Sequence, residues 1–135
     1  MDVNGYSLDR ADPRDLPESE QIAIARLFQR MTKEILPEDP ERPIDAILPR
    51  LRANVPNQWV ARVRARDTRG NVVGVGYTSR SLNEPENAHV LWTEISVHPD
   101  HRRKGLGRAI LAHLVAAAEG QNPKLTFTGM TNDRI

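Results

Sequence analysis

The stretch ISVHPDHRRKGLGR, residues 95–108, decides how this chain folds and what it can bind. A short apolar run ends at Pro99, a basic cluster follows, and an apolar helical pattern begins at the glycines, so the order is strand, basic loop and helix. Glycine lets backbone N–H groups turn toward one point because it carries no Cβ. A helix N-terminus adds free N–H donors and a partial positive charge, and arginine and lysine add full charges. The stretch therefore predicts a phosphate site, and we expect a ligand that carries a diphosphate.

Two other glycine-rich phosphate loops do not fit the stretch. A dinucleotide-binding fingerprint needs a third glycine or an alanine where Ile110 stands, and its glycines follow the strand in a tight turn. Here a mostly basic run separates Val97 from Gly105. A nucleotide P-loop is excluded because no Gly-Lys-Ser/Thr sequence follows. A basic turn that simply faces solvent stays open as the alternative.

Composition limits the classes of protein to which the chain can belong. With 135 residues, it has the length of one domain. Its formal net charge of +1 is too small to attract nucleic acid or an anionic membrane electrostatically. No apolar window approaches a membrane span. Because cysteine is absent, disulfides, cysteine-based metal sites and a cysteine acyl-enzyme are excluded. We expect a cytoplasmic protein in which any acyl transfer is direct or uses another nucleophile.

Periodicity predicts five strands and three helices. The apolar residues of the first helix recur at a spacing near 3.6, and Asp67–Asn71 reads as a hairpin turn. The strands are expected at Val3–Leu8, Trp59–Ala65, Val72–Thr78, His89–Val97 and Leu125–Thr128, and the helices at Glu18–Leu36, Pro43–Ala53 and Leu106–Glu119. Pro49 predicts a break or kink in the second helix. The element order is therefore β-α-α-β-β-β-α-β.

The pattern Val97-x-Pro99 followed by Arg102-x-x-Gly105-x-Gly107 closely resembles the coenzyme A signature of the GNAT N-acetyltransferase superfamily. The resemblance is dense over residues 88–119. It implies an α/β (α+β) fold with a mixed, mostly antiparallel sheet, and a loop that wraps the pyrophosphate of acetyl-CoA. It further implies that the backbone of residues 95–97 pairs with the pantetheine arm. The cofactor contacts it implies are Ile95, Ser96, Val97, Arg102, Arg103, Lys104, Gly105, Leu106, Gly107, Arg108 and Asn132.

Glu94 is the candidate catalytic base, because it is the acid nearest the cofactor signature and GNAT enzymes often use a glutamate on this strand. Side chains alternate along a strand, so Glu94 and Ser96 share one face. A structural glutamate that binds an arginine or faces solvent is the alternative. His98 and His101 do not predict a metal site, since Pro99 prevents a regular helix and no further ligand is spaced nearby.

The predicted function is acetyl-CoA-dependent N-acetylation of a primary amine on a small molecule or peptide, by direct transfer. A GNAT-like module that binds acyl-CoA without transferring it, as a sensor or the inactive half of a tandem pair, is the alternative. The acidic residues around the first two helices, among them Glu38, Asp39 and Asp45, favour a cationic acceptor or simply form a solvated surface. Neither a nucleic acid nor a membrane partner is expected.

The resemblance also carries an expectation about domain organisation. Residues 1–135 read as one acyl-CoA-binding domain that stops after the family's fifth strand, without the last helix and two strands. We expect a homodimer or strand-exchanged assembly that protects the edge of this strand, or a fragment of a longer chain. The sequence around residues 92–99 is also similar to the first domain of tandem-GNAT, mycothiol synthase-like proteins.

Overall fold

Strands from both ends of the chain meet in one twisted sheet. The computed structural model describes residues 2–53, 56–120 and 126–128, and their strands lie in the order β1-β2-β3-β4-β5-β6. Neighbouring strands are antiparallel up to β5, and β6 runs parallel to β5. The strands are β1 Asp2–Val3, β2 Tyr6–Arg10, β3 Gln58–Arg66, β4 Val72–Ser81, β5 Val90–Val97 and β6 Thr126–Thr128.

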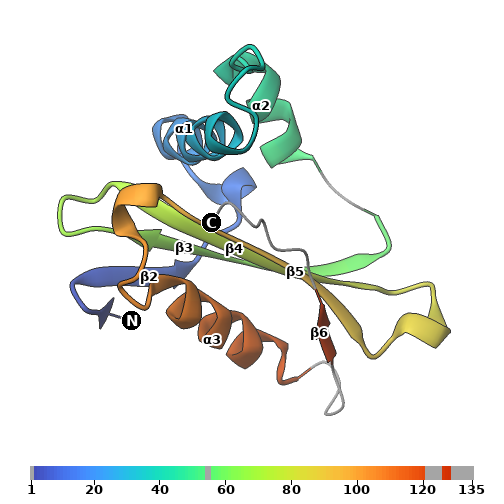
Figure 1. Cartoon of the computed structure of the whole chain (residues 1–135). Coiled ribbons are helices and arrows are strands. Elements are labelled where there is room, and N and C mark those ends of the chain that lie inside the picture. Colours follow the sequence, from blue (N-terminus) through green and yellow to red (C-terminus); the bar gives the residue numbers. More distant parts are fainter. Residues whose placement is uncertain (1, 54–55, 121–125, 129–135) are drawn as a thin grey trace.

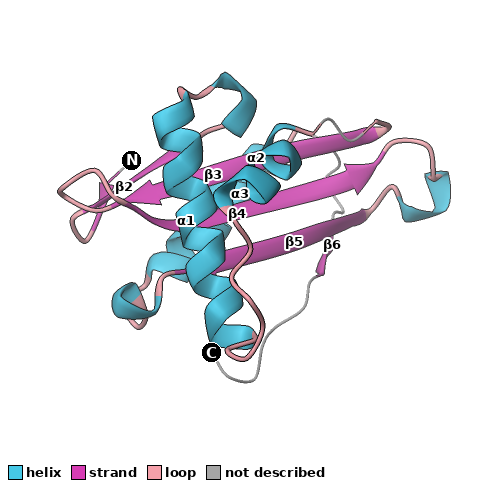
Figure 2. Ribbon diagram, turned by 90° about the horizontal axis from the view of Figure 1, so that it is seen from above, coloured by secondary structure: helices cyan, strands magenta, loops and turns pink. Residues whose placement is uncertain are grey.

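Helices cover both faces of the sheet. Figure 1 shows α1 (Glu18–Ile35) and α2 (Ile44–Arg52) on one face and α3 (Leu106–Ala118) on the other. Seen from above, α1 crosses over the strands (Figure 2). The described helices include none that is long and apolar enough to span a bilayer.

Each face has its own apolar core. Ile24 and Ala25 of α1 pack with residues of α2 on one side. On the other side, the buried positions of α3 recur every fourth residue, which places Leu106, Ile110 and Leu114 on one stripe facing the sheet. The helix approaches β4 so closely that a Cβ on Gly76 would lie 2.5 Å from Cγ2 of Ile110. Glycine at this position therefore sets the distance between α3 and the sheet.

The predicted α+β architecture and mostly antiparallel sheet are confirmed. One expected element is wrong, because the single strand Val3–Leu8 is a hairpin of β1 and β2. Asn4 and Gly5 join the two strands with φ of 51° and 86°, the left-handed conformation that a two-residue Asn-Gly turn adopts. The helix α2 has no break at Pro49, because it continues through this residue to Arg52.

Candidate functional site

The basic loop connects β5 to the N-terminus of α3, which has no side-chain cap. A single turn of 3-10 helix at Pro99–His101 follows β5, and then Arg103 and Gly105 both have left-handed φ, at 60° and 78°. The helix α3 begins at Leu106, and no side chain caps it. Its first backbone N–H groups are therefore available to an anion.

Gly107, at the start of α3, has room for a Cβ atom. A Cβ built on Gly107 would meet only Cγ2 of Val97, at 3.9 Å, which is ordinary van der Waals contact. The glycine is thus not required by the packing of the described protein atoms. A ligand that approaches the backbone closely would explain why the position has no side chain.

Contacts from distant segments hold the basic loop in place. Nε of Arg102 donates to the carbonyl oxygen of Val97 at 3.1 Å, and its guanidinium binds the Glu34 carboxylate of α1 at 2.7 and 2.9 Å. Nδ2 of Asn4 donates to the carbonyl oxygen of Lys104 at 3.3 Å. The hydroxyl of Tyr6 lies 2.8 Å from Nδ1 of His101. None of these partners of the loop was identified from the sequence.

The candidate cofactor residues fall into groups with different surroundings. Arg103, Lys104 and Arg108 are exposed, whereas the guanidinium of Arg102 is engaged with Glu34. The side chain of Leu106 is buried in the core, so only its backbone can face a ligand. Asn132 lies outside the described residues.

The end of β5 beside the loop has no strand partner on one side among the described residues. The pairs between β5 and β6 are Val90–Thr126, Leu91–Phe127 and Trp92–Thr128. Within the described ranges, residues 93–97 of β5 have no strand partner on that side. The backbone of the predicted pantetheine segment, residues 95–97, therefore has a free edge toward which an extended ligand could hydrogen-bond.

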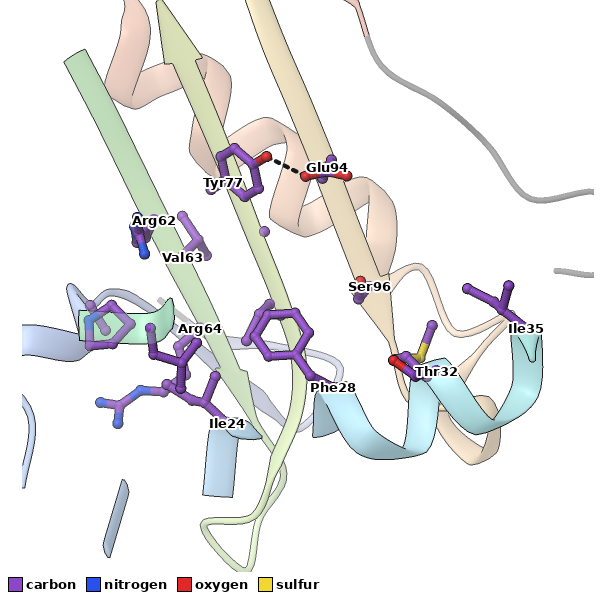
Figure 3. Close-up of a pocket in the computed structure, with 16 residues that line it drawn as sticks. Ile24, Phe28, Thr32, Ile35, Arg62, Val63, Arg64, Tyr77, Glu94 and Ser96 are labelled. Carbon is purple, nitrogen blue, oxygen red and sulfur yellow. Dashed lines mark hydrogen bonds between the residues drawn. The ribbon is translucent and has the colours of Figure 1, made fainter. Parts of the chain in front are cut away.

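A cavity of about 270 Å³ lies between α1 and the sheet. Its α1 wall is largely apolar, and its sheet wall carries polar side chains (Figure 3). The apolar residues include Ile24, Phe28, Met31, Ile35 and Leu51, and the polar ones on the sheet include Arg62, Tyr77, Glu94 and Ser96. Glu94 and Ser96 share one face, as alternation predicts, and both face this cavity.

Tyr77 is the partner of Glu94 across the sheet. Its hydroxyl donates a hydrogen bond to Oε2 of Glu94 (Figure 3). Burial, together with the neighbouring Glu94, raises the pKa of Tyr77 to about 12. The phenol is therefore protonated at neutral pH and remains a donor to the carboxylate. The sequence analysis missed Tyr77, because only the register between β4 and β5 places it opposite Glu94.

No group of three or more His, Asp or Glu side chains that could hold a metal ion occurs in residues 2–53, 56–120 and 126–128. His98 and His101 are instead ring neighbours, with centroids 5.8 Å apart.

The ion pair between Glu34 and Arg102 predicts a pH dependence of stability. The hydrogen bond from Arg102 holds the pKa of Glu34 below its usual range, outweighing the effect of burial. This stabilisation is complete above the pKa of an unfolded glutamate, near ~4.3, and is lost as the pH falls through the lower folded value. Glu34→Gln should lower the free energy of unfolding by about 1 kcal/mol at pH 7. Urea titrations should show that the difference in the free energy of unfolding between wild type and Glu34→Gln is smaller at pH 3 than at pH 7. An equal difference at the two pH values would show that the ion pair with Arg102 does not stabilise the protein.

Comparison with known proteins gives one family. The family model described as "Acetyltransferase (GNAT) domain" matches residues 56–134. No curated protein sequence matches the chain.

Solved structures give the same fold. A Vibrio cholerae integron cassette protein aligns with a TM-score of 0.71 and 14% identity, over 97% of this chain and 78% of that protein. A tandem GNAT protein from the clavulanic acid biosynthesis pathway aligns with a TM-score of 0.67 and 21% identity, over 93% of this chain and 36% of the tandem protein. A GNAT superfamily phosphinothricin acetyltransferase from Sinorhizobium meliloti, solved in complex with AcCoA, aligns at 0.63 and 22% identity, over 86% and 60% of the two chains.

Proposed function

Because the chain belongs to the GNAT acetyltransferase family, we propose that it is an acetyl-CoA-dependent N-acetyltransferase that transfers the acetyl group directly to a primary amine. The main observation in support of this proposal is that β5 contributes to two neighbouring sites. Its end leads into an uncapped helix N-terminus, and its middle places the solvent-exposed side chain of Glu94 on the lining of the cavity between α1 and the sheet.

The pyrophosphate of acetyl-CoA would bind the first N–H groups of α3. Gly105 supplies the left-handed turn, and Gly107 leaves room for the phosphate oxygens. The exposed side chains of Arg103, Lys104 and Arg108 would add positive charge to this site. Arg102 would act differently, since its guanidinium ties the loop to α1 and to the end of β5. Asn132 stays a prediction from the family resemblance.

The thioester would reach the cavity along residues 93–97 of β5, where the described part of the chain provides no strand partner on one side. The backbone of residues 95–97 would pair with the pantetheine arm, and one N–H group there would polarise the thioester carbonyl. This arrangement requires no particular side chain at Ile95 or Val97, both of which pack against the core under α3. The reactive carbonyl would then face the side of the sheet that bears Glu94.

The acceptor amine would lose its proton to Glu94. The phenol of Tyr77 holds one carboxylate oxygen of Glu94, which leaves the other oxygen for the ammonium group. The neutral nitrogen then attacks the thioester carbon, the C–S bond breaks, and the nitrogen gives up a second proton to solvent as the amide forms. The departing thiolate takes up a proton from solvent, so that one proton is released overall. No covalent intermediate on the protein is needed.

Calorimetry and a turnover assay test the proposal together. We expect coenzyme A and acetyl-CoA to bind and NAD not to bind, and we expect release of free thiol with a panel of primary amines. Binding of acetyl-CoA without turnover of any amine would instead support a non-catalytic acyl-CoA-binding module. Failure of coenzyme A to bind at millimolar concentration would contradict both functions.

A further inference from the structure

Three polar residues form a row across the sheet on the floor of the cavity. The register pairs Arg62 of β3 with Tyr77 of β4, and Tyr77 with Glu94 of β5. All three side chains line the same cavity (Figure 3). Directly opposed residues in antiparallel strands have Cβ atoms about 5 Å apart, so the Cβ atoms of Arg62 and Glu94 are about 10 Å apart. The row thus presents a cation and a carboxylate on either side of Tyr77.

Arg62 differs from the arginine two residues further along the strand. Arg64 is 5% exposed and is bound by Asp9 at 2.8 Å and by Glu20 at 3.3 Å. The side chain of Arg62 has no hydrogen bond or ion pair with any described residue, although it is partly buried.

Asp12, whose pKa is lowered in part by the charge of Arg62, forms no ion pair with it. Asp12 is held by Arg14, with a closest contact of 2.7 Å. The hydrogen bonds from Arg14 are the main reason why the pKa of Asp12 is lowered, and the charge of Arg62 contributes less. A partly desolvated guanidinium without a close partner favours an anionic ligand.

The rest of the cavity is small, and most of the residues that line it are apolar. Ile24, Phe28 and Met31 of α1 form its wall opposite the row. A volume of about 270 Å³ is just below the usual range for drug-sized ligands, so it suits a compact molecule. The acidic residues Glu38 and Asp39 are exposed and do not line the cavity, so the cationic acceptor that they favoured in the sequence has no support here.

We propose that the acceptor is a free α-amino acid with an apolar side chain, bound through its carboxylate by Arg62 and through its amine by Glu94. This inference rests on the proposed function and specifies the substrate of that site. Because Arg62 and Glu94 both line the cavity, an amine and a carboxylate on one carbon could each make one hydrogen bond of about 3 Å, one to each side chain. The apolar side chain then lies against α1. Neutral Tyr77, between the two charged residues, adds no charge that would oppose either contact.

Acetylation of matched acceptors tests the inference. The panel contains leucine, methionine and phenylalanine as free acids, their primary amides, and the corresponding amines without a carboxyl group. Wild type should prefer the free acids over the amides by at least about tenfold in kcat/KM, mainly through KM. Arg62→Gln should remove this preference, and the control Arg26→Gln, at an exposed arginine of α1 outside the cavity, should keep it.

The outcomes separate this inference from the proposed function. Coenzyme A should bind wild type and Arg62→Gln with the same affinity, because Arg62 lies on the sheet away from the loop before α3. If coenzyme A binds and amides or simple amines react as well as free acids, the amino acid inference is overturned while the acetyltransferase stands. Bound coenzyme A with no turnover of any free amino acid overturns it as well. If coenzyme A fails to bind wild type, the proposed function itself has failed.

Discussion

Replacing Glu94 by glutamine is expected to lower kcat at pH 7 by about 10²–10⁴-fold, the usual contribution of a general base. The amide keeps the shape of the side chain and can still accept a hydrogen bond from Tyr77, but it cannot take the proton of the ammonium group. Activity should recover as the pH rises, because a growing fraction of the acceptor amine is then already neutral. Stopped assays across pH 6–10 would measure both effects.

The affinity for coenzyme A distinguishes a catalytic effect from a structural one. Glu94→Gln should bind coenzyme A as wild type does, since the phosphate loop does not involve this side chain. Glu86→Gln is the matched control, because Glu86 is exposed and lies outside the cavity. A pH–rate profile unchanged by Glu94→Gln would show that Glu94 is only structural.

Replacing Gly107 by valine is expected to weaken coenzyme A binding by at least about 100-fold, which corresponds to about 2.7 kcal/mol. The added methyl groups would occupy the space from which a diphosphate approaches the backbone at the start of α3. The protein itself should accept the change, since the Cβ position is 3.9 Å from its nearest described neighbour. The free energy of unfolding should therefore stay within about 1 kcal/mol of wild type. Calorimetry and chemical denaturation measure the two quantities.

Gly76→Ala is the control, because it should lower the stability of the protein and leave coenzyme A binding unchanged. Its new Cβ would lie 2.5 Å from Cγ2 of Ile110, so α3 must shift or repack. Overpacking of this kind costs about 1–3 kcal/mol of stability, while the backbone that would face the phosphate is unchanged. We therefore expect Gly76→Ala to lose stability and keep its affinity for coenzyme A. We expect Gly107→Val to keep its stability and lose affinity for coenzyme A. Equal loss of stability in both variants would mean that Gly107 is a packing residue.

The sequence alone determined most of the elements and the position of the basic loop before α3. Alternation and helical periodicity act between residues a few positions apart, so the strands, the helices and the start of α3 at Leu106 could be predicted to within a few residues. The alternation that puts Glu94 and Ser96 on one face is equally local. The Asn4–Gly5 turn carried a local signal as well, and the expected single strand there was wrong because that signal was not used.

Only the tertiary structure decided which charged side chains form ion pairs with other described residues. Arg102 carries the family motif, yet its guanidinium binds Glu34, 68 positions away, on a helix whose docking no local pattern specifies. The row of Arg62, Tyr77 and Glu94 depends on two strand registers, and the first of these includes an irregularity between Ala65 and Arg66. A shift of one residue would turn each side chain to the opposite face. Arg62 and Arg64 have the same residue type, strand and face, and the difference between them arises because Asp9 and Glu20 reach only one of the two.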